Sequence, residues 1–262
     1  MGSVMDRPGF ADLAGRIVLV TGASTGIGAA VARGFAACGA RVAVHYNRSA
    51  AEADTVVATI AERGGEAWVE QADLASPAQA AALVDRVARR AGGLDVLVNN
   101  AGDLMWRGAV ADADAELLQR LLDVNFASLV AACRAALPHF RARGRGVVIN
   151  TTSIAARNGG GPGVVLYGAF KGAVSTLTRG LAKEWARENI RVNAVAPGTI
   201  ATPLHDRLTP PETMRAIVAT IPMQRAGTPE DCVGAYLFLA SEQCSGYITG
   251  QVIEVNGGQL MP

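Results

Sequence analysis

The chain has 262 residues, half of them hydrophobic, and a formal net charge of +1. This length fits one large α/β domain, and the near-neutral balance does not favour nucleic acid or an anionic membrane surface as a partner. The four cysteines and three histidines are scattered without metal-ligand or redox spacing, so we expect reduced thiols and no metal site. We see neither a signal peptide nor an apolar run that would span a bilayer, and therefore expect a soluble cytoplasmic protein.

Short runs rich in Val and Ile recur between longer helical segments. They are continuously apolar rather than alternating, which is typical of strands covered on both faces. We expect seven strands, at Ile17 to Val20, Val42 to Val44, Ala67 to Val69, Val96 to Val98, Val147 to Ile149, Val192 to Val195 and Val252 to Val255.

Strand and helix alternate steadily, which predicts a parallel, doubly wound Rossmann-type sheet with helices on both faces. The first helix should end near Gly39, and Ser49 and Pro77 should begin the next two. We expect a single domain over residues 1–262. Its one long connection, residues 203–228, is rich in proline and predicts a lid over the site.

The first predicted strand leads directly into the glycine-rich run Thr21-Gly-Ala-Ser-Thr-Gly-Ile-Gly28, and a helix follows. Such glycines let the backbone approach a pyrophosphate, which then lies at the helix N-terminus. The spacing is Gly-x-x-x-Gly-x-Gly rather than the general Gly-x-Gly-x-x-Gly. A tight turn that binds nothing is the alternative.

The residues after the second predicted strand indicate which dinucleotide would bind. An enzyme that prefers NAD would carry an acid roughly 20 residues past the glycines, but the nearest, Glu52, falls within the next helix. Arg48 instead offers a guanidinium for a 2′-phosphate, with Asn47, Ser49 and Ser24 as further donors. We therefore expect NADP(H), with NAD(H) possible; an ordinary surface arginine is the alternative reading of Arg48.

Only two of the 24 basic residues are lysines, and one of them, Lys171, follows Tyr167 by four positions. At this spacing on a helix the two side chains share a face. An ammonium beside a phenol favours the phenolate, so we expect the pKa of Tyr167 to fall below its usual value of roughly 10.

Taken together, these motifs resemble the short-chain dehydrogenase/reductase superfamily. Further matches are Asn99-Asn-Ala-Gly102, Asn125, Ser153 and Pro197-Gly198, in the family's order between Gly15 and Gly258. The resemblance implies that Tyr167 is the general acid/base, that Lys171 lowers its pKa and holds the nicotinamide ribose, that Ser153 binds the substrate carbonyl and that Asn125 supports a water-linked proton relay. Thr151 and Thr152 compete with Ser153 for its role.

The cofactor-binding set combines the residues above with those that the resemblance implies. It comprises Gly22, Ser24, Thr25, Gly26, Ile27, Gly28, Asn47, Arg48, Ser49, Asp73, Leu74, Asn99, Ala101, Gly102, Tyr167, Lys171, Pro197, Gly198, Ile200 and Thr202. The motif around Lys171 departs from the family at Phe170, where serine is frequent. A glycine-rich segment, residues 158–162, should shape the substrate entrance.

The sequence predicts an NADP(H)-dependent oxidoreductase that interconverts a secondary alcohol and a ketone on a small molecule. A 3-oxoacyl-[acyl-carrier-protein] reductase is one alternative. Members of that type resemble one another in a basic docking patch, and Glu188 stands where one of its arginines would be expected, which weakens this reading. A non-catalytic dinucleotide-binding protein is another. Leu104, Met105 and Trp106, with apolar lid residues, suggest a partly apolar pocket, but the substrate itself cannot be named.

The resemblance also implies a homotetramer. Two long helices are expected over residues 112–140 and 164–187, and both carry surplus apolar residues: Leu118, Leu121, Leu122 and Phe126 on the first, and Leu177, Leu181 and Trp185 on the second. In proteins that this one resembles, these helices pair across a two-fold axis and the C-terminal strand region forms a second one. Packing of these residues within one subunit is the alternative.

Overall fold

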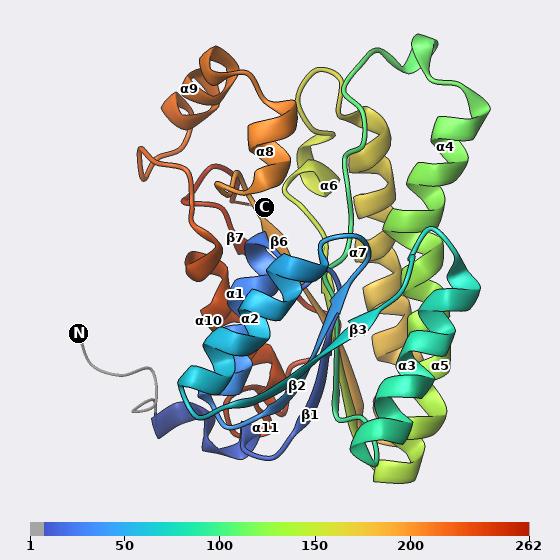
Figure 1. Ribbon diagram of the computed structural model, residues 1–262. Coiled ribbons are helices and arrows are strands. Elements are labelled where there is room, and N and C mark those ends of the chain that lie inside the picture. The colour runs from blue at the N-terminus through green and yellow to red at the C-terminus, as the bar shows by residue number, and fades with distance from the viewer. Residues whose placement is uncertain (1–7, 262) are drawn as a thin grey trace.

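A computed structural model describes residues 8–261 of the chain. Its centre is a seven-stranded sheet of order β3-β2-β1-β4-β5-β6-β7, and every pairing is parallel (Figure 1). The strands are β1 (Ile17–Val20), β2 (Arg41–Tyr46), β3 (Glu66–Gln71), β4 (Val96–Asn99), β5 (Gly146–Thr151), β6 (Ile190–Pro197) and β7 (Val252–Val255). All seven expected strands are confirmed, and so is the doubly wound fold class.

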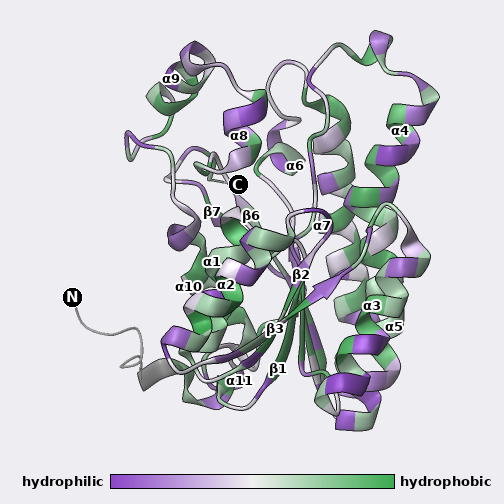
Figure 2. Ribbon diagram, in the orientation of Figure 1, coloured by the Kyte–Doolittle hydropathy of each residue, from purple (hydrophilic) through white to green (hydrophobic). Residues whose placement is uncertain are grey.

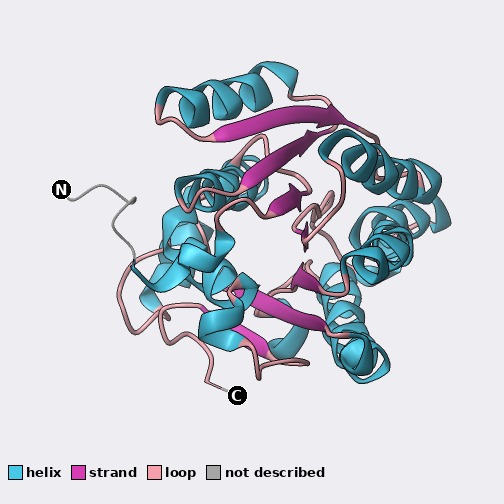
Figure 3. Ribbon diagram, turned by 90° about the horizontal axis from the view of Figure 1, so that it is seen from below, coloured by secondary structure: helices cyan, strands magenta, loops and turns pink. Residues whose placement is uncertain are grey.

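Helices cover both faces of the sheet, because successive strand residues point to opposite sides. Val18 and Val20 join a core beneath α1 (Gly26–Ala37), α2 (Ala50–Glu62) and α10 (Pro229–Ala240). Leu19 joins a second core beneath α3 (Pro77–Ala91), α5 (Ser128–Arg143) and α7 (Val165–Trp185). Viewed from below, the sheet lies between these two helical layers (Figure 3), and its strands are mostly apolar (Figure 2).

Short elements complete the chain. They are η2 (Pro8–Leu13), η3 (Val110–Asp112), α4 (Ala115–Leu122), η4 (Asp123–Ala127), α6 (Ala155–Asn158), η5 (Ala186–Glu188), α8 (Pro203–Leu208), α9 (Pro211–Ala219) and α11 (Glu242–Ser245). The expected helix boundaries hold: Gly39 follows α1 with a φ of 79°, Ser49 precedes α2, and Pro77 begins α3.

The helix expected over residues 112–140 is found as one continuous helical stretch, Ala115–Arg143, with a π-helical turn inside it. A π-helical turn at Asp123–Ala127 separates α4 from α5. By length and composition alone, the helix Ala115–Arg143 is long and apolar enough to cross a membrane, so the expectation that the chain has no such stretch was wrong. Within this fold α5 lies against α3 and buries Leu129, Ala136 and Phe140, as the core helix of a globular domain does.

Residues 203–228 form two short helices rather than an open loop. Both α8 and α9 stand above the carboxyl ends of the strands, at the upper left of Figure 1. Prolines at the start of each helix replace amides that would have no intrahelical partner.

At the opposite, amino end of the sheet a buried carboxylate joins three elements. Asp95, only 2 % exposed, accepts a hydrogen bond from the Ile17 amide at 2.9 Å and from both Arg143 and Arg16. Burial alone would raise the pKa of Asp95, but the Ile17 amide and the Arg143 guanidinium outweigh it and hold the pKa below its usual value. These charge-assisted hydrogen bonds hold the starts of β1 and β4 together at the end of the sheet away from the cavity.

Candidate active site

The carboxyl ends of β1, β2, β4, β5 and β6 open onto one cavity of about 960 Å³. The strand order reverses between β1 and β4, and ligands of open α/β sheets bind at such a point. Nearly every residue predicted for the site lines this cavity: Gly22, Ser24, Thr25, Gly26, Ile27, Gly28, Asn47, Arg48, Ser49, Asp73, Leu74, Ala101, Gly102, Ser153, Tyr167, Lys171, Pro197, Gly198, Ile200 and Thr202. Two do not, Asn99 and Asn125.

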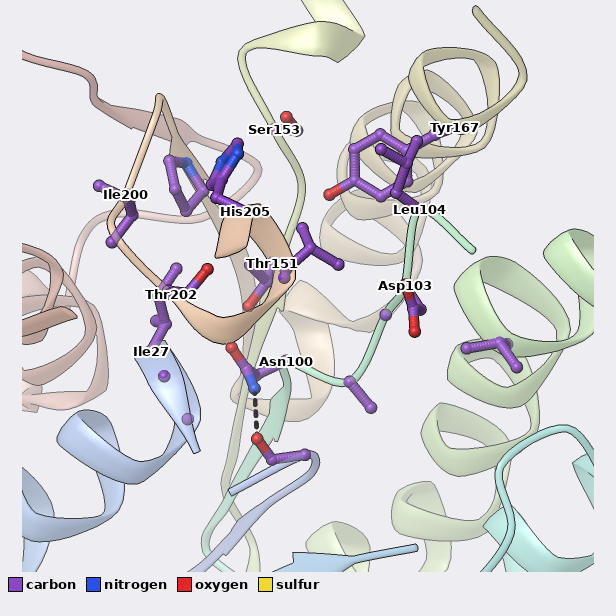
Figure 4. Close-up of a pocket in the computed structure, with 18 of the residues that line it drawn as sticks. Ile27, Asn100, Asp103, Leu104, Thr151, Ser153, Tyr167, Ile200, Thr202 and His205 are labelled. Carbon is purple, nitrogen blue, oxygen red and sulfur yellow. Dashed lines mark hydrogen bonds between the residues drawn. The ribbon is translucent and has the colours of Figure 1, made fainter. Parts of the chain in front are cut away.

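The glycine-rich turn is held closely against the loop that follows β4. A Cβ at Gly28 would lie 2.2 Å from the Gly22 carbonyl oxygen and 2.5 Å from the Asn100 side-chain nitrogen, so only glycine fits there. Asn100 Nδ2 donates to the carbonyls of Thr21 at 2.9 Å and Gly22 at 3.0 Å (Figure 4). The turn is therefore fixed with its backbone exposed at the N-terminus of α1, which suits a pyrophosphate.

His45, at the end of β2, is a site residue that the sequence reading missed. Its Nδ1 accepts a hydrogen bond from the Gly22 amide at 2.9 Å, so the ring proton lies on Nε2, which donates to the Ala72 carbonyl at 3.1 Å. Burial lowers the pKa of His45 to about 4, which keeps the ring neutral at physiological pH. His45 thus links the glycine turn to β2 and β3; no local motif signals these tertiary contacts.

The part of the cavity beside the ends of β2 and β3 carries both acidic and basic groups. Asp73 accepts hydrogen bonds from Asn47 Nδ2 and from the Ala75 amide, each at 3.0 Å, so the loop after β3 is joined to the end of β2. Arg48 lies on the exposed rim, and no hydrogen bond or ion pair within residues 8–261 holds its guanidinium.

Ser153, after β5, and Tyr167, on α7, face the same space (Figure 4). Burial raises the pKa of Tyr167 to about 12, and the nearby Asp103 also raises it, although a hydrogen bond with Ser153 opposes both. The expected lowering by Lys171 is not found in this structure. The Lys171 Nζ lies 5.5 Å from the centroid of the Tyr167 ring, and burial of the phenol is the largest influence on its pKa.

Lys171 is 3 % exposed, and its Nζ donates to the Thr151 carbonyl at 2.9 Å. Burial lowers the pKa of Lys171 to about 8. The hydroxyls that compete with Ser153 have other partners: Thr151 Oγ1 lies 2.7 Å from the Tyr236 hydroxyl, and Thr152 Oγ1 donates to the Lys171 carbonyl at 2.7 Å. Ser153 is thus the residue among the three whose hydroxyl reaches Tyr167.

Asn125 lies inside the π turn and behind the cavity wall. Its Nδ2 donates to the carbonyls of Asp103 at 2.9 Å and Leu121 at 3.0 Å, and its Oδ1 accepts from the Asp103 amide at 3.1 Å. A Cβ built on Gly102 would lie 2.9 Å from both Asn125 Oδ1 and Lys171 Nζ, so these two side chains flank the same backbone position. Asn125 therefore holds the loop that passes in front of Lys171.

Asn99 lies off the cavity wall, within the sheet. Its Nδ2 donates to Asn150 Oδ1 at 3.0 Å and approaches Cys133 Sγ at 3.3 Å. The side chain of Asn99 therefore braces β4 against β5 and α5, and it is the neighbouring Asn100, Ala101 and Gly102 that reach the cavity.

The outer part of the cavity contains charged residues that sequence reasoning did not single out. Arg207, on α8, donates to both carboxylate oxygens of Asp103, at 2.7 and 2.8 Å. Arg107 donates from Nε to the Leu208 carbonyl at 3.2 Å and from Nη1 to the Pro162 carbonyl at 3.1 Å. Three segments distant in sequence meet here, so the pattern of a single segment could not reveal the cluster.

A family model described as enoyl-(acyl carrier protein) reductase matches residues 22–259. The chain is 40% identical over 255 residues to 3beta-hydroxysteroid dehydrogenase 1 of Eggerthella lenta, covering 96% of each. It is 38% identical to a 3-oxoacyl-[acyl-carrier-protein] reductase of Synechocystis, covering 95% of this chain and 98% of the relative.

Solved structures agree with these relatives. An NADH-dependent reductase A1-R′ responsible for alginate metabolism superposes with a TM-score of 0.88 at 38% identity, covering 97% of this chain and 100% of its own. A short chain dehydrogenase from Burkholderia cenocepacia in complex with NADP gives 0.87 at 36%, covering 94% and 98%. The chain belongs to the short-chain dehydrogenase/reductase superfamily. It is an oxidoreductase whose cofactor is NAD(H) or NADP(H).

Proposed function

We propose that the protein is an NADP(H)-dependent oxidoreductase that interconverts a secondary alcohol and a ketone, with Tyr167 as the general acid/base. The observation that carries this proposal is the meeting of Ser153, Tyr167 and Lys171 in the cavity that the glycine turn also lines. The nicotinamide, when bound, supplies or accepts the hydride. The chain's own residues orient the substrate oxygen and move its proton.

Proton transfer at the substrate oxygen falls to Tyr167. With a pKa of about 12 the phenol is protonated at neutral pH, so it can donate to a developing alkoxide. Ser153 faces the phenol in the same cavity and offers the second contact to the same oxygen. Lys171, with a pKa of about 8, is mostly charged at neutral pH and stabilises negative charge on the phenol after the proton has left.

The proton-transfer role is tested with Tyr167→Phe. We expect turnover of any ketone substrate to fall by roughly 10²- to 10⁴-fold, the usual loss for a general acid/base. NADPH binding, followed by the change in its fluorescence, should stay within about twofold, because the phenyl ring keeps the packing. Near-normal turnover by the purified Phe variant would remove Tyr167 from this role.

The preference for NADP(H) is supported by Arg48, an exposed arginine on the cavity rim whose guanidinium has no acidic partner among residues 8–261 and is free to bind a 2′-phosphate. A charge-assisted hydrogen bond contributes about 1.5–3 kcal/mol, or roughly ten- to a hundredfold in affinity. Arg48→Ala should therefore weaken NADPH by about that factor and NADH much less. Arg63→Ala, an exposed arginine just after α2, is the matched control. Equal affinity of the unmodified protein for NADH and NADPH would contradict the preference.

The 3-oxoacyl-[acyl-carrier-protein] reductase remains the second candidate, since the family model and the Synechocystis relative carry related names. An acidic carrier protein would dock on a basic patch, and the resemblance implies that one arginine of that patch stands at position 188. Glu188 instead engages Arg141, whose Nη2 donates to Glu188 Oε1 at 2.9 Å. Comparing turnover of a 3-oxoacyl thioester on carrier protein with the same acyl group on a short thiol distinguishes the candidates, since a carrier-dependent enzyme must prefer the first.

Two wider features belong to the same proposal. Residues 203–228 act as a lid, supported by the position of α8 and α9 over the strand ends. A cytoplasmic location is supported by Cys133 and Cys232, which are buried as reduced thiols, as is usual in the reducing interior of a cell.

A further inference from the structure

Basic side chains dominate the outer, substrate half of the cavity. Arg107, Arg120, His205 and Arg207 line it, and Asp103 is the acid among them. Arg207 donates two hydrogen bonds to the Asp103 carboxylate, and the charges of these two residues balance each other. No ion pair within residues 8–261 engages Arg107 or Arg120, so this half of the cavity carries an unbalanced positive charge.

Arg107 is the better held of these two arginines. Its bonds to the Leu208 and Pro162 carbonyls fix the guanidinium between the end of α8 and the glycine-rich segment. Gly163 makes room for its stem, because a Cβ there would lie 2.7 Å from Arg107 Cγ. Arg107 is half-buried, and no hydrogen bond from its Nη2 is found within the described chain. An ordered guanidinium edge therefore remains available to a ligand.

His205 extends this edge into the cavity (Figure 4). Its Nδ1 lies 3.0 Å from the buried Thr209 hydroxyl, which fixes the ring. His205 lies on α8, whose Leu208 carbonyl accepts a hydrogen bond from Arg107, and both side chains line the same cavity. Burial and then the charge of Arg107 lower the pKa of His205, while Asp206 raises it. An anion in that space would be attracted by Arg107 and could accept from the His205 ring.

We propose that Arg107, with His205 beside it, binds a carboxylate of the substrate, so that the enzyme acts on hydroxy acids and oxo acids. The inference rests on the proposed function, since it names the substrate class of the same site. One guanidinium edge and one imidazole suit the two oxygens of a carboxylate, whereas a phosphate would leave acceptors unpaired. The carbon chain between carboxylate and carbonyl would lie against Leu104, Met105 and Leu204, which line the same cavity.

The test compares each oxo acid with its own methyl ester. A ladder from 4-oxopentanoate to 7-oxooctanoate, read by NADPH absorbance, varies the distance between carbonyl and carboxylate. For at least one length we expect the acid to exceed the ester in kcat/KM by about tenfold or more, as a charge-assisted hydrogen bond would give. Esters reduced as well as acids at every length would overturn the proposal.

Arg107→Gln and Arg107→Lys identify the group responsible. The readout is the acid-to-ester ratio, in which any general loss of activity or folding cancels. We expect Gln to bring the ratio near one and Lys to retain part of it. Arg215→Gln, exposed on α9 and off the cavity wall, is the matched control and should keep the ratio. An unchanged ratio in Arg107→Gln would remove Arg107 from this role.

Calorimetric titration of the same acids into the enzyme with NADP⁺ separates the two claims. Acids that bind to the unmodified protein and not to Arg107→Gln, yet are never reduced, would uphold the carboxylate site and contradict the oxidoreductase reaction proposed for it. Reduction of esters without any preference for acids would contradict the carboxylate site and uphold the oxidoreductase reaction. If the acids are neither bound nor reduced, the carboxylate site is overturned.

Discussion

Burial sets the protonation of the reacting pair in opposite directions. It raises the pKa of Tyr167 to about 12 and lowers that of Lys171 to about 8, so the tyrosine holds its proton more firmly and the lysine less firmly than in water. The spacing of the two residues could be read from the sequence, but the sign of the tyrosine shift could not. That sign depends on how completely the surrounding loops remove water.

The neutral imidazole of His45 gives a pH-dependent stability. Its folded pKa is about 4 and its unfolded pKa about 6.5, so the unfolded chain binds more protons between these values. The contribution of His45 is therefore complete above pH 6.5 and is lost as pH falls towards 4, by roughly 3 kcal/mol.

Urea unfolding of the wild type and His45→Gln between pH 4 and 7.5 checks this expectation. The variant should be less stable at pH 7.5, and the difference between the two proteins should shrink as the pH falls. His139→Gln, whose ring is partly exposed beside Asp85, is the control and should not reproduce this convergence. Parallel pH curves for the wild type and His45→Gln would contradict the role of His45.

At the scale of elements, the ion pair between Asp103 and Arg207 joins α8 to the loop after β4. Both side chains are partly exposed, at 32% and 58%, so we expect a contribution of only about 0.2–1 kcal/mol. Arg207→Ala should raise the rate of limited proteolysis within residues 203–228 by about two- to fivefold, and NADPH should slow cleavage in both proteins. Arg215→Ala is the control on the same lid, and equal cleavage of both variants would show that the pair does not hold α8.

The strands could be predicted from the sequence more readily than the contacts between distant segments. The seven strands could be predicted because each is a continuous apolar run between helical segments, a local property. The π turn at Asp123–Ala127 could not, because it has no distinct composition. Arg107 and the carbonyls of Pro162 and Leu208 were also beyond reach, since three loops must be folded before they meet.

At the scale of the whole molecule, the homotetramer remains a prediction. Leu121 and Trp185 were wrongly included in its interface, because both are buried inside the subunit, at 1% and 3% exposure. Leu118 on α4 and Tyr247 near β7 are exposed instead, one near each of the two expected two-fold contacts.

Light scattering at micromolar concentration should give four times the chain mass of 27.0 kDa. Leu118→Glu and Tyr247→Glu should each yield dimers, because each breaks one set of two-fold contacts, and the double variant should yield monomers. Arg63→Glu, outside both regions, should remain tetrameric. A fully active monomer of the wild type would contradict the assembly.

The buried Asp95 lies at the end of the sheet opposite to the cavity. The strand starts that it holds and the loops around the cavity can therefore change independently. At the end of the sheet farthest from the cavity, Asp95 joins the starts of β1 and β4 to the end of α5, through the Ile17 amide and Arg143. Replacement of the loops at the other end does not disturb these bonds. Residues 103–108, 158–163 and 203–228 could therefore be exchanged with those of relatives as a set, giving new substrate selectivity on an unchanged frame.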